Sequence, residues 1–244
     1  AAAASSTRRL ARCVAATSSL PSTAGSSKRK SPNSPWQFRT SCTDPQSLSL
    51  RQSYTLIAPF YDAALNAATR AARSRSLESL PVARARVLLS GVGTGLDLPL
   101  LPTQHSYTGV DLTRAMLRRA VPRAASLDFC CVQADAQRLP FSDHSFDHAI
   151  LHLILAVLPD PLACLRETAR VVAPGGNLLV FDKFLQRGQR APVRRLLNPV
   201  IRRIATRLDV VLEELLEQTP QLIVESDQPA LVAGWFRLIR LKRV

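Results

Sequence analysis

The chain has 244 residues, 46% of them hydrophobic and 20% charged, which is enough apolar material to bury one core of ordinary domain size. Its formal net charge of +14 favours anionic partners such as nucleic acid, acidic lipid surfaces or phosphorylated substrates, without choosing among them. No apolar run approaches the roughly 20 residues of a membrane-spanning helix, so we expect a protein that does not span a membrane.

Residues 1–50 differ in composition from the rest of the chain. They are rich in Ser, Ala, Arg and Pro, and they hold seven lysines and arginines against a single acid, Asp44. Because they also lack apolar periodicity, we expect a disordered basic extension. Such a composition is typical of an organellar transit peptide, although upstream sequence translated by mistake has the same character. The compartment stays open between the cytoplasm, with or without peripheral membrane attachment, and a mitochondrion or plastid.

Beyond residue 50, apolar runs of strand length alternate with longer segments of helical periodicity. A first helix is expected over residues 53–80, and further helices over 114–125 and 160–173, the last ending at the turn Pro174-Gly175-Gly176. Strands are expected over residues 85–91, 106–112, 127–135, 146–155 and 177–184. This alternation predicts an α/β fold, a Rossmann-like three-layer αβα sandwich on a mostly parallel sheet.

The pattern changes after Phe184. Residues 191–218 place apolar side chains at helical spacing with arginines between them, and Pro199 is expected to kink or divide this segment. We therefore assign a basic amphipathic helical insertion to about 188–218, which either packs on the domain or lies on an acidic membrane surface. Strands expected over 221–226 and 235–244 bring the sheet to seven, with an antiparallel last strand, in one domain over 51–244.

The five cysteines do not form a metal-binding pattern. They include no CxxC pair, and no histidine stands at ligand spacing from them. This argues against a structural zinc site, and we expect no bound metal.

The stretch SGVGTGLD follows the first expected strand and contains Gly91, Gly93 and Gly95. In an open parallel sheet, ligands bind at the carboxyl ends of the strands, and the turn after the first strand is the usual place. A phosphate-binding P-loop needs Lys and then Ser or Thr after its last glycine, whereas Leu96 and Asp97 stand here. A dinucleotide fingerprint needs GxGxxG, and Asp97 puts a negative charge where a phosphate would sit. The turn therefore suits a ligand without a phosphate.

Two aspartates end the next two expected strands. GVD ends at Asp111, where a carboxylate can accept hydrogen bonds from both hydroxyls of a ribose. ADA has Asp135 at its centre, one strand further along, where the amino group of an adenine could donate to it. Together with the glycine turn, these acids point to a nucleoside ligand.

Several motifs stand in order along the chain: APFYDA, VLLSGVGTG, YTGVDLTRAML, ADAQRLPFSDHSFDHAIL and ARVVAPGGNLLVFDKF. In this combination the segment from about Tyr54 to Lys183 resembles the class I S-adenosylmethionine-dependent methyltransferases. Within that family it looks most like the branch that contains bacterial phosphatidylethanolamine N-methyltransferases and the C-methyltransferases of ubiquinone and menaquinone biosynthesis.

The resemblance implies S-adenosylmethionine as the cofactor and a set of residues that bind it. The glycines admit its methionine part, Asp111 holds its ribose, and Asp135 with Ala136 borders its adenine. Leu89 departs from the family's VLDLGCGTG, whose third residue is an acid that contacts the polar end of the cofactor; Ser90 and Asp97 are candidates to compensate. The expected cofactor-binding residues are Tyr54, Gly91, Gly93, Thr94, Gly95, Asp111, Leu112, Asp135 and Ala136.

Methyl transfer from a sulfonium is an in-line displacement, so the protein has to hold the acceptor atom and the methyl group about 3–3.5 Å apart and aligned. An amine or enolate carbon also has to lose a proton, and His152, Asp182 and Tyr61 are the candidate catalytic residues. His152 and Asp182 are expected at strand ends that face the cleft, although each also fits a structural role. Tyr61, with Tyr54 and Phe60, looks like part of a lid helix over the cofactor.

The sequence thus predicts a methyltransferase that acts on a small or lipid-like acceptor, such as a phospholipid amine or a quinone precursor, with an anionic membrane surface as a further partner. Two alternatives stay open. One is a basic membrane- or nucleic-acid-associated module that keeps the fold without catalysis. The other is a nicotinamide-dependent oxidoreductase, which would need the longer glycine spacing. Nucleic acid as the methyl acceptor is disfavoured, because LPDP stands after the fourth expected strand in place of an NPPY-like tetrad.

Overall fold

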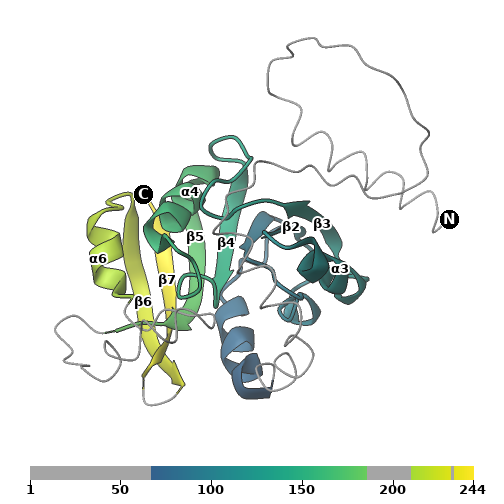
Figure 1. The fold of residues 1–244 in the computed structure, drawn as a ribbon, viewed down its shortest axis with the longest axis horizontal. Helices are drawn as coiled ribbons and strands as arrows, with labels where there is room; N and C mark the ends of the chain where they lie inside the picture. Colours follow the sequence, from purple (N-terminus) through teal and green to yellow (C-terminus); the bar gives the residue numbers. More distant parts are fainter. Residues whose placement is uncertain (1–66, 186–209, 232–233) are drawn as a thin grey trace, which may run out of the picture.

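The computed structural model describes residues 67–185, 210–231 and 234–244, which form one sheet with helices on both faces (Figure 1). The strands are β1 (Arg86–Ser90), β2 (Ser106–Asp111), β3 (Asp128–Gln133), β4 (Phe146–His152), β5 (Val172–Lys183), β6 (Leu222–Leu231) and β7 (Phe236–Arg243). The helices are a segment over 67–77, the short 3-10 helix η1 (Leu98–Leu100), α3 (Arg114–Arg123), α4 (Pro161–Val171) and α6 (Leu212–Glu217).

The seven strands lie in the order β3-β2-β1-β4-β5-β7-β6. All neighbours from β3 to β5 are parallel, whereas β7 runs antiparallel to both β5 and β6. From β1 the chain adds β2 and β3 on one side of β1, and it then crosses back to place β4 on the opposite side of β1. Ligands of open α/β sheets bind at such a switch point. The predicted fold class is confirmed, including the antiparallel last strand.

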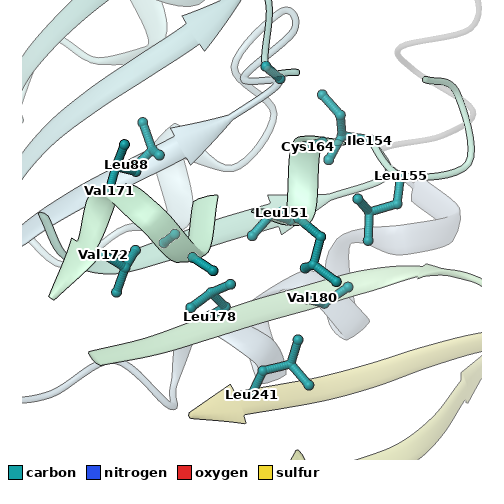
Figure 2. Close-up of a cluster of buried hydrophobic side chains, with 14 of the residues drawn as sticks. Leu88, Leu151, Ile154, Leu155, Cys164, Val171, Val172, Leu178, Val180 and Leu241 are labelled. Carbon is teal, nitrogen blue, oxygen red and sulfur yellow. The ribbon is translucent and has the colours of Figure 1, made fainter. Parts of the chain in front are cut away.

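Alternate strand side chains supply two separate apolar layers. Leu88 and Leu151 face the layer that contains α4 and α6, and Figure 2 shows the α4 side of this cluster. Leu89 and Ile150 face the opposite layer, where Leu77 of the first helix joins side chains of η1 and α3. The sheet is therefore covered on both faces, as the near-continuous apolar runs of its central strands predict.

Two predicted strand ends were wrong, since β6 continues to Leu231 rather than ending at residue 226, and β4 is shorter than expected. β4 ends at His152 rather than at residue 155, because Leu153 adopts a positive φ of 58° that extended backbone does not allow. The Leu153 amide nevertheless donates to the carbonyl oxygen of Phe181 on β5 at 2.7 Å, so the chain stays attached to the sheet while it turns away.

The predicted turn after α4 was also wrong. α4 passes directly into β5 at Val172, and Pro174-Gly175-Gly176 lies within that strand. The register against β4 jumps there, from Val172 opposite Phe146 to Asn177 opposite His148. The Pro-Gly-Gly stretch is therefore an irregularity of the strand that the sequence pattern alone did not separate from a turn.

The predicted insertion at about 188–218 lies mostly outside the described residues, as do Pro199 and the predicted domain boundary at residue 51. Within the described part, α6 continues the predicted helical pattern and buries Leu212 against the α4 layer. Among the helices that the structure describes, none combines the length and the apolarity that a bilayer crossing demands.

Candidate active site

The glycine turn lies between β1 and η1, and its three glycines have φ values of 71°, 55° and 80°. A side chain at Gly91 would collide with Ile154, since an added Cβ would stand 1.9 Å from its Cδ1 atom. A side chain at Gly95 would meet the Cα atom of Ala120 on α3 at 2.9 Å. At Gly93 an added Cβ would come no closer than 4.0 Å to another atom, the carbonyl oxygen of Gly91. Two glycines thus permit close packing, and Gly93 faces open space.

Asp111 ends β2 beside this turn, with its carboxylate directed at the turn. One oxygen accepts a hydrogen bond from the Gly93 amide at 3.0 Å, and the other accepts one from the Thr113 amide at 2.8 Å. Burial raises the pKa of Asp111 to about 6, although the two amides act in the opposite direction. Each carboxylate oxygen can accept a second hydrogen bond, so Asp111 keeps the capacity to bind two donors of a ligand.

Asp135 follows β3 in the loop at the same edge of the sheet. Its carboxylate accepts hydrogen bonds from the backbone amide of Gln137 at 2.9 Å and from the side-chain amide of Gln137 at 3.0 Å. The neighbouring Ala136 is buried in the core. The Asp135 side chain thus stabilises its own loop, and it stands one strand beyond Asp111, as the sequence predicts.

Thr94 and Leu112 complete the predicted cofactor set within the described residues. The Thr94 hydroxyl is buried and accepts a hydrogen bond from the Arg123 guanidinium of α3 at 3.0 Å, which anchors the turn to that helix. The Leu112 carbonyl accepts a hydrogen bond from the Gln133 side chain at 3.0 Å, which joins the ends of β2 and β3.

A buried polar cluster that the sequence did not reveal lies on the β4 side of the turn. Arg73, from the first helix, donates to Asp97 Oδ1 at 3.0 Å, and Nδ1 of His152 stands 3.1 Å from the same oxygen. The second ring nitrogen of His152, Nε2, lies 3.0 Å from the hydroxyl of Ser76. Burial raises the pKa of Asp97, but its interactions with His152 and Arg73 outweigh burial and hold the pKa below the ordinary value.

The sequence signal for this cluster is present on one face of the first helix. Four buried side chains recur there at helical spacing: Thr69, Arg73, Ser76 and Leu77. Within this face, the Thr69 hydroxyl accepts a hydrogen bond from Arg73 at 3.1 Å. This spacing indicates that one face of the first helix is buried although it carries polar side chains. Their partner Asp97 is 24 residues from Arg73 in the chain, and only the fold brings them together.

The two candidate catalytic residues on strands face different layers. His152 lies on the side of the first helix, edge-to-face against Phe181 at 5.8 Å between ring centroids, with both ring nitrogens near polar partners. Asp182 follows Phe181 and so points to the α4 side, where it accepts hydrogen bonds from the amides of Ala156 and Lys183. Burial raises the pKa of Asp182 to about 6. The structure therefore does not bring His152 and Asp182 together.

Leu89 is 2% exposed and packs in the apolar layer between the sheet and the first helix, so this position supplies no charge to the site. Ser90 is buried on the other face, with its hydroxyl 3.9 Å from the sulfur of Cys164. Tyr54, Phe60 and Tyr61 lie outside the described residues. No group of three or more potential metal ligands occurs within the described part of the chain.

Residues 88–180, which contain the turn and both aspartates, match the family model for a methyltransferase domain. The chain is 30% identical over 188 residues to phosphatidylethanolamine N-methyltransferase of Cereibacter sphaeroides, covering 75% of this chain and 92% of that relative. The chain belongs to the S-adenosylmethionine-dependent methyltransferase family. A shorter match, 38% identical over 81 residues, joins it to demethylmenaquinone methyltransferase of Staphylococcus epidermidis and covers 33% of this chain and 34% of the relative.

Solved methyltransferases share the fold. The enzyme from Thermotoga maritima described as a possible histamine N-methyltransferase aligns with a TM-score of 0.60 at 19% identity, covering 80% of this chain and all of that one. A geranyl diphosphate methyltransferase, solved with geranyl diphosphate and the cofactor analogue sinefungin, aligns with a TM-score of 0.58 at 17% identity, covering 72% of this chain and 78% of that one. These alignments show the fold. Membership of the family, shown by the sequence matches, makes the protein a methyltransferase that uses S-adenosylmethionine.

The residues at the carboxyl edge fit this cofactor. Gly93 exposes backbone without a close neighbour on its Cβ side, and Asp111 offers two carboxylate oxygens on the strand next to the one that Asp135 follows. The three groups follow the strand order β1, β2, β3, which matches the order of amino-acid side, ribose and base along the cofactor. No basic P-loop side chain is needed, because the cofactor carries no phosphate.

Replacement of Gly95 by alanine tests the packing of the turn. The variant combines an unfavourable positive φ with a Cβ that overlaps Leu98 and Ala120, so we expect a loss of about 2–5 kcal/mol in the free energy of unfolding. Gly175→Ala is the matched control, because Gly175 has φ 83° but nothing within 4 Å of an added Cβ, and strain alone predicts a loss of about 1 kcal/mol. Urea unfolding measures both; equal losses would show that packing against α3 does not constrain the turn.

The raised pKa of Asp111 predicts a pH-dependent affinity for the cofactor. Hydroxyl donors need the ionised carboxylate, so the affinity for S-adenosylhomocysteine should fall as the pH drops through about 6. Asp111→Asn should bind about 10–100-fold more weakly at pH 8 and lose this dependence. Calorimetry from pH 5 to 8 measures both effects, with the exposed Asp143→Asn as the control. A wild-type affinity that stays constant across this range would contradict the assignment.

Proposed function

We propose that the protein transfers the methyl group of S-adenosylmethionine to a lipid-like acceptor with an apolar body, either a phospholipid amine or a quinone precursor. The observation that carries this is an apolar cluster at the carboxyl edge, which is linked to the loop after the glycine turn through His152 and Asp97. The two relatives described above support the acceptor class, since their names specify a phospholipid and a menaquinone precursor.

The apolar cluster joins the first helix to β4, β5 and β7. Phe181 and Leu238 are buried at its centre with Ala72, and Leu153 and Phe236 pack against them while remaining partly exposed. The Phe181 and Phe236 rings lie 5.7 Å apart. Because this cluster adjoins His152, an acceptor that rests on Leu153 and Phe236 places its reactive head near the end of β4. We assign the tail of the acceptor to this surface.

The chemistry needs orientation more than proton transfer. The cofactor supplies a methyl group on a sulfonium, and the chain's own residues have to fix the acceptor in line with it. Both nitrogens of His152 have polar neighbours, and the Asp182 carboxylate points to the opposite layer and binds backbone amides. We therefore assign these two residues positioning roles. Tyr61 stays a candidate for proton removal from an amine or enolate.

We also propose that the cofactor is held as the motifs predict, with Asp111 on the ribose, Asp135 and Ala136 beside the adenine, and Leu112 and Thr94 shaping the pocket. The net charge of +14 supports supply of the acceptor from an anionic membrane surface.

A transfer assay with matched acceptors tests the acceptor class. Tritiated methyl transfer is measured to phosphatidylethanolamine in vesicles, to a demethylated menaquinone, and to glycerophosphoethanolamine, which has the same amine without the acyl chains. We expect one tailed acceptor to give a kcat/KM at least about 100-fold above that of the soluble amine, because tail burial contributes about 25 cal/mol per Å² of apolar surface. Equal rates with and without the tail would contradict the proposal.

Phe236→Ala tests the surface itself. Removal of this partly buried ring should raise KM for the tailed acceptor about tenfold and leave the binding of S-adenosylhomocysteine unchanged. Ile223→Ala is the control, because Ile223 is 48% exposed on the edge strand β6, away from the carboxyl edge. A KM that stays at the wild-type value in Phe236→Ala would place the acceptor elsewhere.

A further inference from the structure

The amino-acid end of S-adenosylmethionine carries an ammonium and a carboxylate, and both need charged or polar partners when a protein encloses them. Strand order limits where those partners can be. If Asp135 at β3 borders the base and Asp111 at β2 holds the ribose, the remaining part of the cofactor lies over β1 and β4. The side chain of Leu89 on β1 is apolar and 2% exposed, so the charges have to come from elsewhere.

Asp97 and Arg73 are a carboxylate and a guanidinium at this place. Asp97 stands two residues after Gly95, and its cluster includes His152 at the end of β4. The side chain of Asp97 occupies the position that would cap η1, yet it makes no capping hydrogen bond there. It turns to Arg73 and His152 instead, so local helix chemistry does not explain its orientation.

The cluster is open on the Asp97 side. The side chains of Arg73 and His152 are each 2% exposed, whereas that of Asp97 is 15% exposed. Both of its described side-chain contacts fall on Oδ1, and within the described residues none is recorded for Oδ2. A carboxylate with one oxygen held by a guanidinium and close to an imidazole, and with no described contact on its other oxygen, can accept a hydrogen bond from a charged donor.

We propose that Asp97 binds the ammonium group of the cofactor through Oδ2, with Arg73 and His152 as the positioning residues that aim it. This rests on the proposed placement of the ribose at Asp111 and the base at Asp135. In this arrangement the acid that recognises the amino-acid end comes from the loop after the turn, and the interior of β1 stays apolar. The competing interpretation is that Asp97 only fastens the first helix to the turn.

Two ligands separate these interpretations. S-adenosylhomocysteine has the amino-acid end, whereas 5′-methylthioadenosine has the same base, ribose and sulfur without it. Asp97→Asn should weaken S-adenosylhomocysteine about tenfold or more and change 5′-methylthioadenosine less than about twofold, because only the former loses a charge-assisted contact. Asp128→Asn, at the amino end of β3, should change neither affinity. Calorimetry on the full chain gives the dissociation constants.

The proposal is overturned if Asp97→Asn weakens both ligands equally or leaves both unchanged. Since both ligands bind the same folded population, the ratio of their dissociation constants reports the preference even if part of the variant is unfolded. A second measurement needs no variant: the wild-type protein should bind S-adenosylhomocysteine at least about tenfold more tightly than its analogue without the α-amino group. Equal affinities for these two would also overturn it.

A different result would contradict the proposed placement of the ribose at Asp111. If Asp111→Asn leaves the affinity for 5′-methylthioadenosine unchanged, the placement of the nucleoside is wrong, whatever Asp97 does. If Asp111→Asn weakens both ligands and Asp97→Asn weakens neither, only the inference about Asp97 is wrong. The four dissociation constants thus distinguish the two failures.

Discussion

The hydrogen bond from the Gly93 amide to Asp111 is the contact on which the proposed cofactor site depends. It ties the end of β2 to the turn that follows β1, and it pairs a buried charge with a backbone donor that only an unusual turn conformation can present. Burial of the ionised Asp111 carboxylate still costs free energy, because desolvation raises its pKa to about 6 in spite of these hydrogen bonds. A ligand that donates to the same oxygens relieves this cost, so binding and the shape of the turn are coupled.

Sheet geometry decides which polar residues can act together. Successive residues of a strand face opposite layers, and so Phe181 and Asp182 belong to different environments although they are adjacent in the chain. His152 shares its layer with Phe181 and with the first helix. Both His152 and Asp182 lie near the carboxyl edge, and this predicted that they share one cleft. In the sheet, His152 is opposite Phe181, so Asp182, the next residue along β5, faces the other layer.

Much of the architecture could be predicted from the sequence because the signals are local. Apolar runs such as that around Leu88 identify the strands, and the spacing of three glycines identifies the turn. The wrong boundaries arise where the backbone leaves the usual pattern: Leu153 takes a positive φ inside an apolar run, and Pro174-Gly175-Gly176 continues a strand. The positive φ of Leu153 is not favoured by its residue type, and its amide is held by the Phe181 carbonyl of β5. Gly175 does favour its φ of 83°, and the register against β4 jumps across this stretch of β5.

The polar cluster at Asp97 could not be predicted for a related reason. Its members come from three segments, and Arg73 and Asp97, which contact each other directly, are separated by 24 residues in the chain. What the sequence does show is an apolar residue, Leu89, at the position where the motif VLDLGCGTG of the family has an acid. A carboxylate inside β1 would have to be desolvated between two packed layers, whereas one in the following loop can keep a solvent-facing oxygen and use Arg73 as its counter-ion. In the proposed arrangement, the loop position therefore recognises a cation at a smaller desolvation cost than a position inside β1.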